Sequence, residues 1–163
     1  MALEPVVPAQ DQSIEGIRIN DAVSYEMYDD RNVRIHLLPM SADLSPRAKH
    51  NEFVKGMCML ATMIEKAEGA PEEHALRHVE RINTVSWAIH TNPDILEMFK
   101  FTVDKDGVDA LGKKLCKEYS DNPPKHIGDE YRGLPALYAF MDRGDFLAEY
   151  GSKSKKARKY GIQ

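Results

Sequence analysis

Residues 45–69 have the sequence SPRAKHNEFVKGMCMLATMIEKAEG, and this stretch decides the fold that we expect. Ser45 followed by Pro46 is a helix start, because the hydroxyl can accept a free backbone N–H and proline at the first helical position costs no hydrogen bond. The helix should run to about Glu68 and stop at Gly69. Its middle is apolar nearly all round, a pattern typical of a helix in the protein interior. We therefore expect this helix to be the centre of the core.

Upstream of this helix, residues 17–37 alternate between apolar and polar side chains with a period of two. The alternation lies on both sides of the turn-rich residues 29–32 (DDRN), which is typical of a β-hairpin. A short strand can also precede it. Because a two-stranded hairpin is only marginally stable by itself, it has to pack on apolar partners. We expect the helices to supply them.

The chain after residue 70 predicts further helices. Pro71 with Glu72 and Glu73 marks a second start, and apolar residues from Ala75 to Ile89 recur at helical spacing. We expect these additional helices over residues 71–92, 93–101, 108–119 and 134–150, the last in two pieces. The expected fold class is therefore α+β, with an N-terminal β-hairpin packed on a bundle of four to six α-helices.

The length of 163 residues predicts one domain with tails. We expect a flexible acidic arm over residues 1–16, a single, mainly helical α+β domain over 17–150 and a basic tail over 151–163. The N-terminus lacks the features of a secretory signal, and no apolar run approaches the ~18 residues of a membrane span. We expect an intracellular, by default cytoplasmic, protein without membrane contact, in which Cys58 and Cys116 are a reduced, buried pair.

Charge is distributed unevenly along the chain. The net charge is −4, but residues 1–150 hold 17 basic and 26 acidic residues and carry −9 by themselves. The tail holds no acidic residue, and we expect it to stay unfolded and to contact an anionic surface such as RNA or DNA without sequence preference. The basic residues of the tail are Lys153, Lys155, Lys156, Arg158 and Lys159.

Two groups of residues resemble metal sites but lack ligands that such sites need. His74 and His78 are spaced i, i+4, yet Ala75 stands where a zinc protease has its general base. Residues 104–107 (DKDG) resemble the start of a calcium loop, but Leu115 stands where a glutamate should close it. We expect a turn there, with Asp106 capping the next helix. The sequence predicts no metal and no cofactor.

No group of residues predicts a catalytic site with any specificity. Ser86, His90 and Asp94 follow one another at successive helical turns, but nothing nearby supplies the strained position and oxyanion hole that a nucleophile needs. The sequence also has no phosphate-binding glycine loop and no nucleophile elbow. We therefore assign no catalytic residue.

Two further features are candidate binding sites. The segment around residues 126–132 crowds polar groups into a loop, where function is often located; its candidate residues are His126, Asp129, Glu130, Tyr131 and Arg132. On the expected helix 71–92, Trp87 and Leu76 lie beside the apolar stripe, where they either anchor a partner or are covered by another element.

The leading functional hypothesis is a non-enzymatic interaction or assembly module that binds a protein or nucleoprotein partner, with the basic tail on RNA or DNA. One alternative is a small enzyme, a hydrolase or transferase, that uses the 126–132 loop. Another is an acidic regulatory or inhibitor protein that covers a basic surface. The sequence predicts no oligomeric state.

Overall fold

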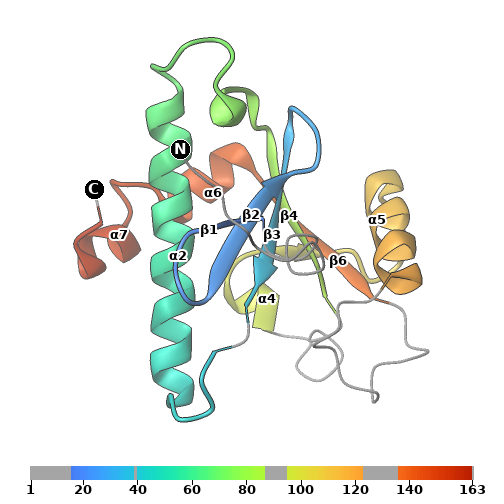
Figure 1. Cartoon of the computed structure of the whole chain (residues 1–163), viewed down its shortest axis with the longest axis horizontal. Coiled ribbons are helices and arrows are strands. Elements are labelled where there is room, and N and C mark those ends of the chain that lie inside the picture. The colour runs from blue at the N-terminus through green and yellow to red at the C-terminus, as the bar shows by residue number, and fades with distance from the viewer. Residues whose placement is uncertain (1–15, 39, 87–94, 123–135, 163) are drawn as a thin grey trace, which may run out of the picture.

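The computed structural model describes residues 16–38, 40–86, 95–122 and 136–162 (Figure 1). Its centre is a mixed sheet of six strands in the order β1-β2-β3-β4-β6-β5. The β3–β4 pair is parallel, and the other neighbouring pairs are antiparallel. The strands are β1 (Ile17–Arg18), β2 (Val23–Met27), β3 (Asn32–Leu37), β4 (Arg81–Ser86), β5 (Thr102–Val103) and β6 (Leu137–Asp142).

Helices cover both faces of this sheet (Figure 1). One large core cluster joins the sheet to α2, α6 and α7, and a second, smaller cluster joins β4 and β6 to α5. The helices are α2 (Pro46–Ala67), the 3-10 helix η1 (Ala75–His78), α4 (Ile95–Met98), α5 (Ala110–Asp121), α6 (Arg143–Tyr150) and α7 (Lys155–Tyr160).

The class α+β is confirmed, but the expected hairpin on a helical bundle is wrong, because the chain builds a six-stranded sheet. The predicted hairpin exists as β2 and β3, with Met27 opposite Val33 at the turn, and it forms one part of that sheet. Asp29 closes the turn by accepting the backbone N–H groups of Arg31 and Asn32 at 2.9 Å each. The hairpin thus packs mainly as a sheet neighbour of β4.

The expected helix over residues 71–92 is the main error. In its place stand η1 and the strand β4, and residues 87–92 lie outside the described part. The apolar positions fitted a helical period, but three of the six residues of β4, Ile82, Thr84 and Val85, are β-branched and favour a strand. Pairing of this segment with β3 on one side and with β6 on the other stabilises the strand.

The expected helix over residues 134–150, in two pieces, is wrong in its first piece and confirmed in its second. Residues 137–142 (LYAFMD) form β6, and only Arg143–Tyr150 is helical, as α6. The strand alternates between the two core clusters, with Ala139 and Met141 in the larger and Tyr138 in the smaller. A segment that buries side chains on both faces shows weak alternation in sequence. The helix 108–119 is confirmed as α5, shifted by two residues.

The central helix is confirmed. Ser45 Oγ accepts the backbone N–H of Ala48 at 3.1 Å, and the helix runs from Pro46 to Ala67. Ten of its 22 residues are buried, so it is a core element. At Gly56 it approaches β2 so closely that a Cβ would lie 2.7 Å from Val23 Cγ2. The absence of a side chain there lets the helix lie directly on the sheet.

The expected unfolded tail is also wrong, because residues 155–160 form α7, which packs on α2 and α6. Ser154 Oγ caps the helix by accepting the N–H of Ala157 at 3.1 Å, and Gly161, with φ of 69°, ends it. Ala157 is fully buried, and the Tyr160 hydroxyl donates to Asn51 Oδ1 at 2.8 Å. These apolar and capping residues alternate with the lysines and indicate a helix, but the high charge of the segment led to the prediction of an unfolded tail.

Truncating the centre of α2 should destabilise the protein strongly. Leu60 is fully buried, and Leu60→Ala is expected to lower the free energy of unfolding by ~2 to 5 kcal/mol in urea. The exposed Lys66 of the same helix serves as the control, and Lys66→Ala should stay within ~0.5 kcal/mol. A loss below about 1 kcal/mol for Leu60→Ala would show that the helix is misplaced.

Both thiols should be unreactive in the folded protein. Burial raises the pKa of Cys58 and that of Cys116 to about 11, and only the thiolate reacts. Iodoacetamide at pH 8 should therefore modify the folded protein far more slowly than the same protein in urea, as followed by mass spectrometry. Equal rates in the two states would contradict this placement of the cysteines.

Candidate functional site

The histidines and aspartates that resembled metal ligands serve local structure. His74 Nδ1 accepts the N–H of Leu76 at 3.2 Å at the start of η1, while His78 Nε2 pairs with Glu72 at 3.1 Å. In the segment 104–109, the carboxylate of Asp104 accepts two backbone N–H groups at 3.0 Å each. Asp109, and not Asp106 as expected, caps α5. Within the described ranges no group of three or more His, Cys, Asp or Glu could hold a metal ion.

The remaining sequence candidates fall on different parts of the chain. Trp87 and the loop candidates at residues 126–132 lie outside the described residues, as do His90 and Asp94. Leu76 is 1% exposed and belongs to the larger core cluster, so it offers no exposed anchor. Among the described helices none is long and apolar enough to cross a membrane.

The structure does bring the basic residues of the C-terminal segment onto one surface. At 100° per residue, Lys155, Arg158 and Lys159 fall within a 100° arc of α7, while Ala157 lies on the opposite, buried side. The three basic residues of the arc are exposed, as is Lys153 just before the helix. We call these four residues the basic face; they are Lys153, Lys155, Arg158 and Lys159.

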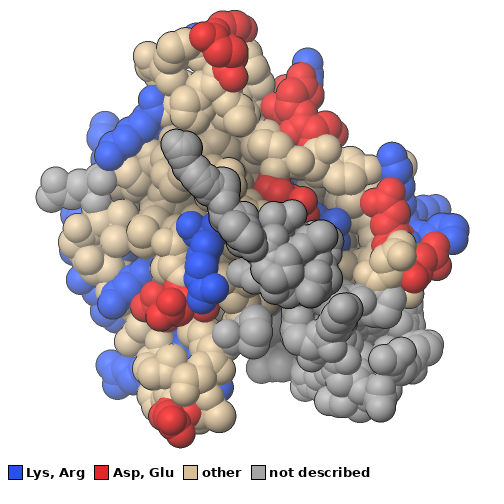
Figure 2. Space-filling model, in the orientation of Figure 1, with Lys and Arg blue, Asp and Glu red and all other residues tan. Residues whose placement is uncertain are grey.

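The cations of the basic face have no acidic partner among the described residues. Lys156 differs from them, since it pairs with Glu149 of α6 and is only partly exposed. None of the four cations of the basic face forms an ion pair with a described residue. In Figure 2, Lys and Arg side chains gather along the left edge of the molecule, where α7 lies in Figure 1.

The Tyr160 ring of α7 contacts one cation of the basic face and one of the central helix. The ring of Tyr160 lies 5.5 Å from Lys159 Nζ and 5.6 Å from Lys55 Nζ of α2. A cation over an aromatic ring contributes about 0.5 to 1 kcal/mol at an exposed site. Lys55 thereby brings a further positive charge close to α7.

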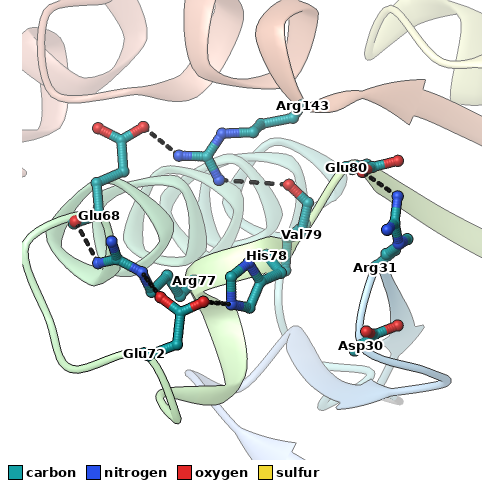
Figure 3. A pocket seen from close by; sticks show the side chains of 9 residues that line it. All are labelled: Asp30, Arg31, Glu68, Glu72, Arg77, His78, Val79, Glu80 and Arg143. Atoms are coloured by element: carbon teal, nitrogen blue, oxygen red, sulfur yellow. Dashed lines mark hydrogen bonds and ion pairs between the residues drawn. The ribbon is translucent and has the colours of Figure 1, made fainter.

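A second candidate is a hollow of about 770 Å³ between the β2–β3 turn, the end of α2, η1 and the start of α6 (Figure 3). Figure 3 shows two clusters of charged side chains facing each other across it, one around Arg77 and Arg143 and the other around Arg31. Its lining is almost entirely charged and comprises Asp30, Arg31, Glu68, Glu72, Arg77, His78, Val79, Glu80 and Arg143.

The charges of this hollow are already engaged with one another. Arg31 pairs with Glu80 at 2.7 Å, and Arg77 pairs with Glu72 at 3.0 Å. Arg143 pairs with the Glu68 carboxylate and also donates to the carbonyl of Val79 at 3.4 Å.

Arg77 joins the end of α2 to η1. Its Nη1 donates to the carbonyls of Glu68 and Ala70 at 2.6 and 2.7 Å. Carbonyls at a helix end have no partner within the helix, so Arg77 satisfies groups that would otherwise face the hollow. We assign the hollow a structural role, and the basic face is the better candidate for binding.

The chain matches no protein-family model, no curated protein and no solved structure, so its function has to be argued from its own residues.

Removing the Arg77 guanidinium should weaken the end of α2. Arg77→Met loses the hydrogen bonds from a charged guanidinium to two carbonyls, and a hydrogen bond of this type contributes about 1.5 to 3 kcal/mol to stability. Because the side chain is 32% exposed, we expect a loss near the lower end of that range in urea unfolding. Arg31→Met is the matched control, since its side-chain partner is an exposed carboxylate and such pairs are worth ~0 to 1 kcal/mol. Equal losses for the two variants would refute this role.

Proposed function

We propose that this protein is a non-enzymatic interaction module that binds a nucleic-acid-containing partner through the basic face of α7. The observation that carries the proposal is a set of four exposed cations, none of them paired with a described acidic residue. Three lie on a short helix that itself contains no acidic residue, and Lys153 lies just before it. Phosphate groups, spaced regularly along a nucleic acid, are the anions that such a set can neutralise together.

The folded state of α7 supports this proposal in a way that an unfolded tail would not. Lysine and arginine side chains on a docked helix already point in one direction. Binding by this helix therefore costs less backbone conformational entropy than binding by an unfolded chain. The cost is reach, because a helix of six residues spans only about 9 Å. We therefore expect weak binding with few contacts.

The chemistry of the basic face predicts contacts to phosphates and not to bases. Three of its four cations are lysines, which act as point charges, and it presents no Asn or Gln for base recognition. Residues 1–150 carry a net charge of −9 and repel a polyanion. A partner should therefore approach from the α7 side only, without sequence preference.

The two other hypotheses stay predictions. The residues of the enzymatic alternative, 126–132, lie outside the described part of the chain, and the inhibitor alternative rests on the net charge of −9 of residues 1–150. The binding experiment below separates them from the interaction module, because neither predicts affinity for a polyanion.

Salt dependence tests the proposal quantitatively. If the four cations each neutralise one phosphate of duplex DNA, the slope of log K against log salt should be about −3.6 at most, from −0.9 per contact. The triple variant Lys155→Gln, Arg158→Gln, Lys159→Gln should reduce the slope to about −0.9, since Lys153 remains. Fluorescence anisotropy over a range of salt concentrations measures both.

The control removes the same charge from another helix. Lys113, Lys114 and Lys117 are exposed on α5, and their triple glutamine variant should keep the slope of the unmodified protein. Equal slopes for the two triple variants would refute the basic face as the binding surface. No affinity for DNA or RNA at low salt, together with binding to an acidic protein, would replace the nucleic acid by a protein partner.

A further inference from the structure

A row of polar side chains lies on the sheet face opposite the larger core. Along β2, β3 and β4, residues such as Tyr25, Ile35 and Ile82 belong to the core that contains α2. Side chains alternate between faces along a strand, so the residues between them point to the α5 side. The polar row consists of Ser24, Glu26, Arg34, His36 and Asn83.

Strand pairing places the members of the polar row next to one another. Arg34 is opposite Glu26 on one side and opposite Asn83 on the other. One step along the same strands, Ser24 is opposite His36. Because neighbouring strands lie about 4.8 Å apart, all five side chains share a small area of the sheet.

Several groups of the polar row are buried and have no hydrogen-bond partner. Ser24 and Asn83 are both 0% exposed. Within the described part of the structure, Ser24 Oγ, Arg34 Nε and both amide atoms of Asn83 accept or donate no hydrogen bond. A buried polar group without a partner costs about 1 to 3 kcal/mol, so this arrangement is destabilising unless something else bonds to it.

The other buried polar side chains show that this is a local property. Thr84 Oγ1, on the opposite face of β4, donates to the carbonyl of Ile35 at 3.1 Å, and Thr62 Oγ1 donates to that of Cys58 at 3.0 Å. Ser154 caps α7. Of the five buried polar residues among those described, only Ser24 and Asn83 have side chains without a partner, and both belong to the polar row. The buried hydroxyl of Tyr138 on β6 also has no hydrogen-bond partner among the described residues, and it lies on the same α5 side of the sheet.

The two remaining members fix the charge of the row. Glu26 Oε1 lies 2.7 Å from His36 Nε2, and this hydrogen bond holds the pKa of Glu26 below its usual value. The carboxylate is therefore anionic and accepts the Nε2 proton, which orients the imidazole. The Arg34 guanidinium lies 5.5 Å from the Tyr119 ring of α5, while its Nε stays free for another acceptor.

We infer that the polar row binds a small monocarboxylate that carries a hydrogen-bond donor on the neighbouring carbon, as α-amino and α-hydroxy acids do. Arg34 Nε and Asn83 Nδ2 are N–H donors on neighbouring strands and suit the two oxygens of a carboxylate. Asn83 Oδ1 is an acceptor beside them and suits the amino or hydroxyl group of the ligand.

Charge favours a carboxylate over a phosphate at this place. Glu26 lies opposite Arg34 and is anionic, so the two charges offset each other and an added dianion would be repelled more strongly than a single negative charge. Ser24 and His36 Nδ1, in the next position along the strands, can accept or donate to the rest of the ligand. The site is distinct from the basic face of α7 and shares no residue with it.

Binding is tested on the full chain by NMR titration with L-alanine, L-lactate, propionate and inorganic phosphate. Either L-alanine or L-lactate should shift the amide signals of residues 34 and 83 with saturation, and the better of the two identifies the donor group. Propionate has the same carbon skeleton without the donor and should bind about ten-fold more weakly, the effect of one lost hydrogen bond. Phosphate should not bind.

Two variants and one control locate the site. Asn83→Leu and Arg34→Met should each abolish saturable shifts, and Arg34→Met keeps the test available should Asn83→Leu fail to fold. Thr84→Val lies on the same strand but faces the other core, and it should leave the affinity for the probe unchanged even where it lowers stability.

Two results would overturn the inference. One is the absence of saturable shifts with all four probes at their highest soluble concentrations. The other is an unchanged affinity in Arg34→Met. If the row binds nothing and its groups are simply unpaired, Asn83→Leu should be neutral or stabilising in urea and no probe should bind, because replacing unpaired polar groups by an apolar side chain of similar size removes their cost.

Discussion

The burial of α2 against the sheet is the constraint on which the rest of the structure depends. Ten of its residues are buried, and the helix contacts elements from both ends of the chain. Gly56 brings the helix onto β2, Asn51 Oδ1 accepts the hydroxyl proton of Tyr160 at the end of α7, and Glu65 Oε1 accepts the N–H of Ser152 at 3.0 Å. Each buried aliphatic or aromatic side chain contributes roughly 1.5 to 3 kcal/mol, so these contacts can order a short terminal helix that would not form alone.

The same packing explains how a basic segment becomes a surface. Ala157 and Tyr160 hold one side of α7 on α2, and Glu149 neutralises the cation nearest to α6. The other cations are then turned outward on a fixed arc. The C-terminal carbonyls of α7 favour nearby positive charge, so Arg158 and Lys159 are compatible with both the helix and the proposed binding. The positive charges near the C-terminus of α7 therefore stabilise the helix and remain exposed for binding.

Sequence alone predicted the parts of the fold that local signals determine. The Ser45–Pro46 start, the apolar middle of α2 and the alternating hairpin are such signals, and all three were found. β4 and β6 were missed because each pairs with two neighbouring strands and is covered on both faces. Such a strand is apolar on both sides and shows no clear alternation in the sequence. The polar row was missed for a related reason: Ser24, Arg34 and Asn83 come together only through strand register. The basic residues were found, but their helical state depended on contacts with α2.

The central claim is that α7 is folded and docked on α2, so that its cations form a fixed face. The most direct measurement is the NMR nuclear Overhauser effect between the Tyr160 ring and residues 51 and 55 of α2, with the Cα chemical shifts of residues 155–160. The account predicts cross-peaks to α2 and helical shifts in the free protein, since the Tyr160 hydroxyl donates a hydrogen bond to Asn51 and the ring lies beside Lys55. Random-coil shifts without cross-peaks to α2 would contradict it.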